Sequence, residues 1–462
     1  MRQTTGLIST YSSDEFGICS ALYELGGMVV MHDASGCNST YTTHDEPRWY
    51  DMDSMIYISA ISETEAILGD DDKLIGDLIE TAKELQPKFI ALVGAPIPYM
   101  IGTDLDAVAK IVSRRTGIRC FAFAANGMRD YTAGISMALE QMVKEYAADG
   151  SKGSNANMCR QQDSTRKSDA DHASEEFDNI QKKNKKDSGD GGCIVNIIGA
   201  TPLDFSLNGS ISSIQRWIAD HGMANGICLS MGCSLEDVEQ AGEAQVNLVV
   251  SAGGLAAAKV LRERFGTPYV AGVPFGERFS GFLADQVREA AMTSENCVSY
   301  IAAKNLLCAA GSGSYRDAAY RRKNISDPAV HREIIPGKPK TGSAKNTGGN
   351  PDVGKTLAII GEAVCSASLA AAIEAEYGVK ADVLCPLETG VELLHPEDFA
   401  APEEDDLLRL IGNYTGVIAD PLYRPLVRDG QKFYPLPHEA FSGRIYDGVN
   451  PNLIAVRLAQ KP

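Results

Sequence analysis

Long apolar runs are absent from this sequence. No hydrophobic stretch approaches the roughly 20 residues that a helix needs to span a bilayer. The first residues, Met1 to Gly6, do not form the hydrophobic region of a signal peptide. Both absences argue against a membrane or secreted protein, and we expect the chain to be cytoplasmic.

Positive charge is also scarce. The chain has 43 Lys and Arg against 61 Asp and Glu, a net charge of −18. Such a chain repels a phosphate backbone, so nucleic acid is not expected as a partner. Eleven cysteines are scattered along the sequence. In a reducing cytoplasm, this usage favours buried thiols and metal ligands over disulfides.

Strand and helix patterns alternate in three segments, 1–148, 193–314 and 356–462. The 462 residues are enough for two or three domains. Each segment contains short apolar runs typical of buried parallel strands, such as Phe89–Gly94. This alternation of strands and helices predicts an α/β fold with three Rossmann-like domains, whose parallel sheets surround a central cleft.

Two polar stretches separate these segments. Residues 149–192 contain few aliphatic side chains and are expected to form a flexible surface insertion. Residues 315–355 are expected to be a linker. Gly349–Thr356 matches the phosphate-loop pattern G-x-x-x-x-G-K-T, but it precedes a strand instead of following one. We therefore interpret it as a linker that enters a strand and not as a nucleotide site.

Two cysteines, Cys19 and Cys37, follow glycine-containing turns. Gly17 and Gly36 stand close to them in the sequence, and a residue without a Cβ lets the backbone approach a bulky inorganic group. Thiolates are the usual protein ligands of iron–sulfur clusters, and a cluster needs four. The pair therefore suggests a site shared between two chains. The alternative is two buried core thiols.

Several short motifs occur in an order that is more specific than any one of them. They are His32–Cys37, Ser59–Gly69, Pro87–Val93, Met100–Leu105, Val246–Val249 and Arg262–Pro268. This order resembles nitrogenase component 1 subunits over nearly the whole chain and is most like the β-type subunit. The resemblance implies an oxidoreductase component. It also implies a separate electron donor, an ATP-dependent iron–sulfur reductase of the iron-protein type.

The resemblance further implies a cluster site. The β-type subunit supplies three cysteines to an interfacial iron–sulfur cluster, and by motif position Cys19 is the first and Cys37 the second. Pro96 stands where the third is expected. Two cysteines from each of two chains would supply the four thiolates of one [4Fe–4S] cluster. The second chain is either another copy, as a homodimer, or a sister component 1-like subunit, as a heterodimer.

The sequence departs from the family at a second position. The α-type subunit anchors its iron–molybdenum cofactor through a cysteine, and Ser251 stands in that place here. The cofactor histidine has no clear match, although His438 lies nearby. We therefore do not expect this chain to reduce dinitrogen. The cleft is expected to bind another substrate, a second metallocofactor or a tetrapyrrole-like ligand.

Candidate catalytic residues flank the Cys37 turn. His32, His44, Asp45 and Arg48 could donate protons or orient a substrate there. Alternatively, His44 to Arg48 form a charged surface corner. His438 is a further candidate in the cleft.

Three functions remain open. The first is a nitrogenase-like reductase component, and the second is a scaffold that assembles or carries a metallocofactor. The third is a non-catalytic α/β protein that binds a metal or tetrapyrrole.

Overall fold

The computed structural model describes residues 12–36, 46–148, 192–310, 340–341, 356–443 and 450–455. Cys37, His44 and Asp45 lie outside them, as do nearly all of the first polar stretch and the phosphate-loop segment 349–355. What the sequence predicts for those residues stays a prediction, and so do the domain boundaries. Among the described helices, none is long and apolar enough to cross a membrane.

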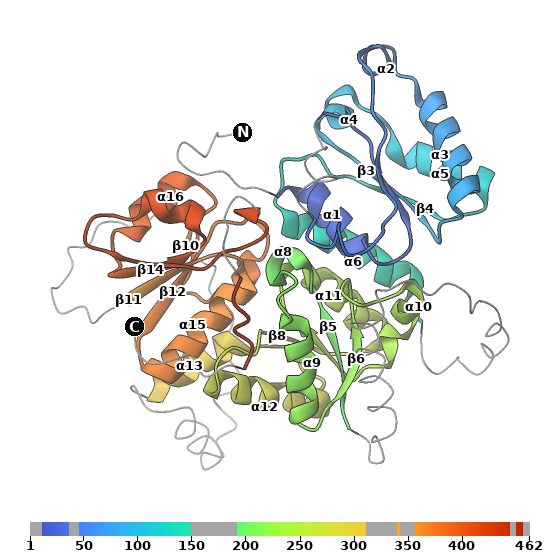
Figure 1. Cartoon of the computed structure of the whole chain (residues 1–462). Helices are drawn as coiled ribbons and strands as arrows, with labels where there is room; N and C mark the ends of the chain where they lie inside the picture. The colour runs from blue at the N-terminus through green and yellow to red at the C-terminus, as the bar shows by residue number, and fades with distance from the viewer. Residues whose placement is uncertain are drawn as a thin grey trace.

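Three parallel sheets with helices on their faces build the molecule (Figure 1), which confirms the predicted α/β class. The strand orders are β2-β1-β3-β4, β6-β5-β7-β8-β9 and β10-β13-β12-β11-β14-β15. β1 lies between β2 and β3, β5 between β6 and β7, and β11 between β12 and β14. Each sheet therefore has a topological switch point beside β1, β5 or β11. The carboxyl ends of these strands are where a ligand crevice is expected.

The strands are short. Those of the first sheet are β1 (Met28–Met31), β2 (Ile56–Ile58), β3 (Ile90–Val93) and β4 (Cys120–Phe123). Those of the second are β5 (Ile194–Ile198), β6 (Ala224–Cys228), β7 (Val246–Val249), β8 (Tyr269–Ala271) and β9 (Cys297–Val298). Those of the third are β10 (Lys340–Thr341), β11 (Thr356–Ile360), β12 (Lys380–Cys385), β13 (Phe399–Ala400), β14 (Gly416–Ala419) and β15 (Lys432–Pro435).

The helices alternate with the strands along the chain, and α1 precedes β1. In the first segment they are α1 (Asp14–Leu22), α2 (Glu63–Leu68), α3 (Asp71–Leu85), α4 (Pro96–Ile101), α5 (Leu105–Thr116) and α6 (Tyr131–Tyr146). In the second they are α8 (Pro202–Phe205), α9 (Ser210–Asp220), α10 (Leu235–Val238), α11 (Leu255–Phe265), α12 (Arg278–Thr293) and α13 (Ser299–Ala310). In the third they are α15 (Ala363–Tyr377) and α16 (Glu404–Ile411).

Local sequence signals explain most of these boundaries. The central strands β1 and β3 are buried at every position, as expected of parallel strands covered on both faces. Asp70 caps α3 by accepting a hydrogen bond from the Lys73 N–H, and Asp104 caps α5 in the same way. Gly117 ends α5 in the left-handed conformation that glycine adopts without strain.

Helices α1 and α6 pack at unusually close range. A Cβ at Gly17 would lie 2.0 Å from the Tyr131 carbonyl oxygen, and a Cβ at Gly134 would lie 1.9 Å from that of Asp14. Only glycine fits at such contacts. The two helices are therefore held together backbone to backbone, and α6 carries that contact toward the second sheet.

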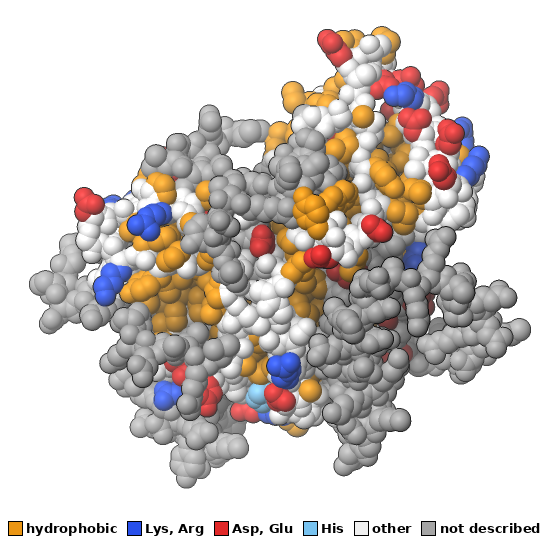
Figure 2. Space-filling model, in the orientation of Figure 1, with side chains coloured by type: hydrophobic (Ala, Val, Ile, Leu, Met, Phe, Trp, Pro, Cys, Tyr) orange, Lys and Arg blue, Asp and Glu red, His pale blue; other side chains and the backbone are white. Residues whose placement is uncertain are grey.

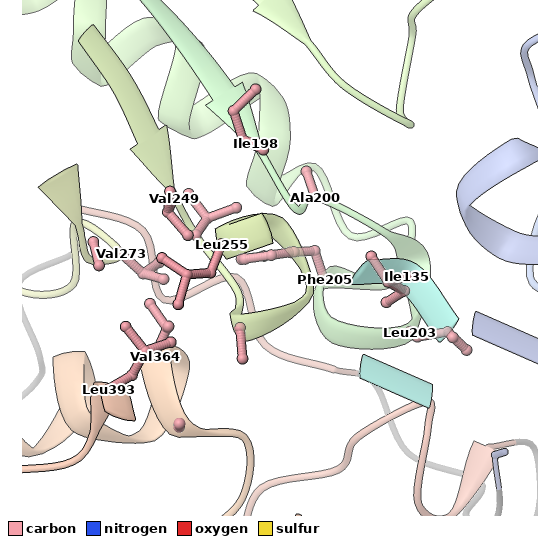
Figure 3. Packing of buried hydrophobic residues seen from close by; sticks show 14 of the residues in the cluster. Ile135, Ile198, Ala200, Leu203, Phe205, Val249, Leu255, Val273, Val364 and Leu393 are labelled. Atoms are coloured by element: carbon pink, nitrogen blue, oxygen red, sulfur yellow. The ribbon is translucent and has the colours of Figure 1, made fainter. Parts of the chain in front are cut away.

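Apolar side chains continue the core from one sheet to the next. In Figure 3, Ile135 of α6 lies beside Leu203 and Phe205 of α8, and Val364 of α15 lies near Leu255 and Val273. All six belong to one cluster of buried residues. This packing fixes the ends of the second and third sheets relative to α6, and it positions the site described below.

The sequence motifs do not predict the helix that begins at Pro96. Helix α4 runs from this residue to Ile101, and Gly102 is its C-cap. Proline suits this position because the first residue of a helix has no partner for its N–H. Farther along the chain, a 3₁₀ turn at Glu239–Glu243 follows directly after α10.

Candidate active site

A small cavity lies between the carboxyl ends of the second and third sheets. Its volume is about 80 Å³, and it is lined by side chains that follow β5, β11, β14 and β15. The ionisable members of the lining are Asp204, Glu362, Cys365, Asp420 and His438. Among the residues that the structure describes, no lysine or arginine lines it. The cavity is therefore acidic and lies where ligands bind in doubly wound sheets.

Glu362 caps helix α15 from inside the protein. Its carboxylate accepts backbone N–H bonds from Ala252 at 2.8 Å, Val364 at 3.0 Å and Cys365 at 2.8 Å. The residue is only 1% exposed. Burial, and then the charge of Asp204, raise the pKa of Glu362 to about 7, although the three N–H bonds oppose this shift. Near neutral pH, Glu362 can therefore hold or release a proton.

Asp204 is the second carboxylate of the cavity, and its side chain is fully buried. Oδ1 accepts a 2.6 Å hydrogen bond from the Tyr131 hydroxyl. Oδ2 is buried and has no hydrogen-bond partner among the described residues. A buried carboxylate oxygen without a partner is unusual. It leaves an acceptor available to a molecule in the cavity.

His438 lies opposite Asp204, with Nε2 at 3.4 Å from Oδ1. Its Nδ1 accepts a hydrogen bond from the Ala440 N–H, and Asp420 accepts one from the His438 backbone N–H. Burial disfavours the charged ring, but Asp204, Asp420 and Glu362 outweigh it, so the pKa of His438 is raised. Because Nδ1 accepts a hydrogen bond, the one proton of the neutral ring is on Nε2, the nitrogen that faces Asp204.

The structure separates the roles of Ser251 and Cys365. Ser251 is buried, and its hydroxyl accepts a bond from the Gly253 N–H at the start of a short 3₁₀ turn. Cys365 lines the cavity from helix α15, and its thiol donates to the Val250 carbonyl at 3.6 Å. The sulfur atom that lines the cavity therefore belongs to Cys365. It lies beside Val250, the neighbour of Ser251, which stands in place of the cofactor cysteine of the α-type subunit.

Cys19 lies on α1 and is completely buried. Burial, with the charges of Glu15 and Glu46, raises the pKa of its thiol well above the usual range. Glu15 is also buried, and desolvation raises its pKa to about 7. A Cβ at Gly127 would lie 2.8 Å from Pro96 and 3.2 Å from Glu15. Pro96 therefore lies in the neighbourhood of the helix that carries Cys19.

These residues do not complete a cluster site by themselves. Among the described residues, no group of three or more His, Cys, Asp or Glu side chains could hold a metal ion. Cys19 is one thiolate, and a [4Fe–4S] cluster needs four. The described part of one chain therefore does not fit the cluster alone, and Cys37 and a second chain would have to supply the rest.

Arg48 is buried, and all three nitrogens of its guanidinium group donate hydrogen bonds inside the protein. It donates to Glu46 at 2.6 Å and Glu24 at 2.8 Å, and its remaining N–H groups reach Ser20 and the Ser230 carbonyl. This network ties the segment after residue 45 to α1 and to the loop that follows β6. The structure thus gives Arg48 a positioning role, and its catalytic role stays a prediction.

Gly36 is exposed, and a Cβ there would meet no atom within 4 Å. Among the described residues, nothing yet requires glycine at this position.

Asp204 and Asp420 were not predicted from the sequence, although each follows a strand end. That position at the edge of a parallel sheet is the signal that could have identified them.

Known proteins place the chain in a family. The model for nitrogenase component 1 type oxidoreductases matches residues 21–310. The chain belongs to this family. One subunit of the light-independent protochlorophyllide reductase of Nostoc punctiforme is 39% identical over 83 residues, which cover 18% of this chain and 16% of that one. The nitrogenase iron–molybdenum cofactor biosynthesis protein NifE of Clostridium pasteurianum is 26% identical over 212 residues, or 46% of this chain and 38% of that one.

The matched segments thus span less than two fifths of the length of either relative. A solved structure of nitrogenase Cp1 at pH 6.5 superposes with a TM-score of 0.55 and 13% identity, over 95% of this chain and 86% of that one. This likeness concerns the fold. It confirms the component 1 architecture that the motif order predicts.

Proposed function

We propose that this chain is the substrate-binding component of a nitrogenase-like reductase. An ATP-dependent iron–sulfur reductase would supply electrons, and a [4Fe–4S] cluster held by Cys19, Cys37 and a second chain would carry them. The substrate would bind in the cavity beside Glu362. The observation that carries the proposal is this cavity, in which buried groups that can exchange protons face one another at the strand ends.

Reduction of a bound molecule consumes protons together with electrons. Glu362, with a pKa of about 7, would donate one at neutral pH. The Tyr131 hydroxyl keeps its proton because burial and Asp204 raise its pKa far above neutrality. It therefore orients Asp204, whose open Oδ2 would accept a hydrogen bond from the substrate. His438 would hold the second proton on Nε2.

The size and charge of the cavity favour a small substrate. About 80 Å³ is well below the roughly 300–1,000 Å³ of pockets for drug-sized ligands. A tetrapyrrole would not fit without displacing side chains. The lining has three carboxyl groups and, in the described part of the chain, no lysine or arginine, which disfavours an anion. We therefore favour a small neutral or cationic substrate, and we do not favour dinitrogen because Ser251 replaces the cofactor cysteine.

A cofactor-assembly scaffold is the second candidate. The match to NifE, a cofactor biosynthesis protein, covers 46% of this chain, more than the 18% covered by the protochlorophyllide reductase match. A scaffold would use the same cysteines without substrate turnover. The proton-holding groups around Glu362 favour the reductase, because carrying a finished cofactor needs no proton donor.

The test is electron delivery under anaerobic conditions. The reconstituted protein is mixed with an ATP-dependent iron-protein-type reductase, ATP and dithionite, and its cluster signal is followed by electron paramagnetic resonance. A reductase component shows ATP-dependent reduction of the cluster. Reoxidation on adding candidate small substrates should be slowed in Glu362→Gln and unchanged in Glu63→Gln, an exposed glutamate on α2. A cluster that no ATP-driven donor reduces would refute the reductase and favour the scaffold.

A further inference from the structure

We propose that the cavity beside Glu362 holds its ligand through one uncharged group that both donates and accepts a hydrogen bond, as a primary amide or a hydroxyl does. This ligand is the substrate only if the chain has the proposed function, on which that part of the assignment rests. Binding itself needs neither the cluster nor an electron donor, so it can be tested separately.

Two buried side-chain atoms of the lining have no hydrogen-bond partner among the described residues. They are Oδ2 of Asp204 and Nε2 of His438. Oδ2 is an acceptor, and the side chain of Asp204 is fully buried. Native proteins pair the large majority of such buried atoms with protein groups or with ordered water. Two unpaired atoms in one cavity therefore indicate a molecule that pairs them both.

Nε2 of His438 is a donor. Nδ1 of the same ring accepts the Ala440 N–H at 3.3 Å, so Nε2 carries a proton whether the ring is neutral or charged. Nε2 lies 3.4 Å from Oδ1 of Asp204, a long contact that leaves this N–H without a hydrogen-bond partner in the described part of the chain. That oxygen already accepts a bond from the Tyr131 hydroxyl. Asp204 and His438 thus offer one acceptor and one donor to a ligand.

The other two carboxylates of the lining are held by the protein. Glu362 accepts three backbone N–H bonds. Asp420 accepts the His438 N–H at 2.8 Å and the Ser442 hydroxyl at 2.7 Å. Asp420 thereby fixes the turn that carries the His438 ring, so the position of the Nε2 donor is set before a ligand binds.

Apolar side chains make up much of the remaining lining, and the space is small. They include Phe205, Phe275, Leu369, Leu436 and Phe441. One ordered water needs about 10–15 Å³ of such volume, so about 80 Å³ has room for a few heavy atoms. Because apolar side chains cannot pair a polar atom, the donor and the acceptor of a small ligand are directed to the two unpaired atoms.

A primary amide meets both requirements. Its N–H donates to Oδ2 of Asp204, and its carbonyl oxygen accepts from Nε2 of His438. A hydroxyl does the same through a single atom. A carboxylate has no donor and brings negative charge to Asp204, whereas an amidinium has no acceptor and leaves the buried His438 N–H unpaired. A ketone has an acceptor but no donor.

The test compares probes of one shape on the full-length protein. Acetamide, acetate and acetamidinium share a planar skeleton and differ in their donors and acceptors, acetone keeps the acceptor alone, and isopropanol presents a hydroxyl. Each is titrated at neutral pH while NMR follows the chemical shift of the His438 Nε2 nitrogen. We expect acetamide to bind at least about fivefold more tightly than acetone or acetamidinium, each of which leaves one buried partner unpaired. Acetate should not bind.

A cation also collects on the outer surface of this acidic protein. The net charge is −18, and Figure 2 shows acidic side chains on the upper lobe that α2 and α3 form. Salt screens such exposed charges more than buried ones. The titrations are therefore read at His438 and repeated at high salt, which should leave the affinity for acetamide unchanged.

Asp204→Asn should change the selectivity. The Tyr131 hydroxyl donates to the Oδ1 position, so the amide oxygen of the variant takes that place and Nδ2 replaces Oδ2. The cavity then presents two donors. Acetamide should bind at least about fivefold more weakly, and acetate should become detectable. The matched control is Asp220→Asn, an exposed aspartate on α9 that does not line the cavity, and it should change neither affinity.

The outcomes are distinct. Tighter binding of isopropanol than of acetamide would assign the group to a hydroxyl and support the paired donor and acceptor. Acetate or acetamidinium that binds as tightly as acetamide would overturn the proposal, and so would a His438 shift that no probe changes, which leaves only water in the cavity. Circular dichroism checks folding, and the wild-type comparison decides if Asp204→Asn does not fold. Failure of the ATP-driven cluster reduction would remove the substrate role and leave the acetamide result intact.

Discussion

Glu362 gives the most quantitative prediction. The pKa of its carboxyl rises from 4.5 to about 7 in the folded protein. At 1.36 kcal/mol per pH unit, this difference corresponds to about 3 kcal/mol. Because the folded state holds the proton more tightly, the carboxyl is neutral in both states below pH 4.5 and carries no penalty. Stability is then lost progressively as the pH rises to about 7.

Glu362→Gln removes this dependence. The neutral amide still accepts the Ala252 and Val364 N–H bonds through its oxygen, but it loses the bond from Cys365, which is worth about 1 kcal/mol. At pH 8 the variant should therefore be more stable than the wild type by about 2 kcal/mol, from the charge penalty less the lost bond. Near pH 4.5 it should be slightly less stable.

The assay has two parts. Urea unfolding at several pH values gives the stability difference between wild type and variant, with Glu63→Gln as the exposed control. Infrared titration of the protonated carboxyl band gives the midpoint directly, and Glu15→Gln removes the other glutamate whose pKa is about 7. A stability difference that does not change with pH, or a Glu362 midpoint near 4.5, would refute the reasoning.

Three other predictions follow from buried contacts. Arg48→Met should destabilise the protein by about 3 kcal/mol or more, because it leaves a buried carboxylate uncompensated. The same change at an exposed arginine should have little effect, and urea unfolding measures both variants. Gly134→Ala should cost about 1–3 kcal/mol through its backbone clash, while Gly76→Ala, in open space on α3, should stabilise by up to about 1 kcal/mol; equal thermal shifts would contradict the close packing. Asp204→Asn should lower the pKa of His438, because Asp204 raises it; an unchanged NMR titration would contradict this.

The sequence predicted the fold because each part of it has a local signal. Buried parallel strands such as β1 and β3 are continuous apolar runs, and caps such as Asp70 and Asp104 mark where helices begin. The order of short motifs identified the family, and the family model confirms it. Helix α4 was missed because the prolines of Pro96–Ile101 read as a loop, although proline is favoured in a first helical turn.

The candidate site was harder to predict because it is assembled from distant segments. Asp204 and His438 are far apart in sequence, and only the packing of the second sheet against the third brings them to one cavity. No local pattern distinguishes the buried Glu362 from a solvated glutamate at a strand end. Arg48 also needed the structure, since its partners Glu24 and Ser230 come from other elements.

Iron content tests the central claim most directly. The protein is reconstituted anaerobically with iron and sulfide, and iron is counted in the wild type, in Cys19→Ala and in the control Cys120→Ala, which alters a half-buried cysteine on strand β4. If Cys19 and Cys37 share a cluster between two identical chains, the wild type and the control hold about four irons per dimer and Cys19→Ala holds none. A wild type that stays colourless in the presence of any partner chain, or a Cys19→Ala variant that keeps its iron, would contradict the shared cluster.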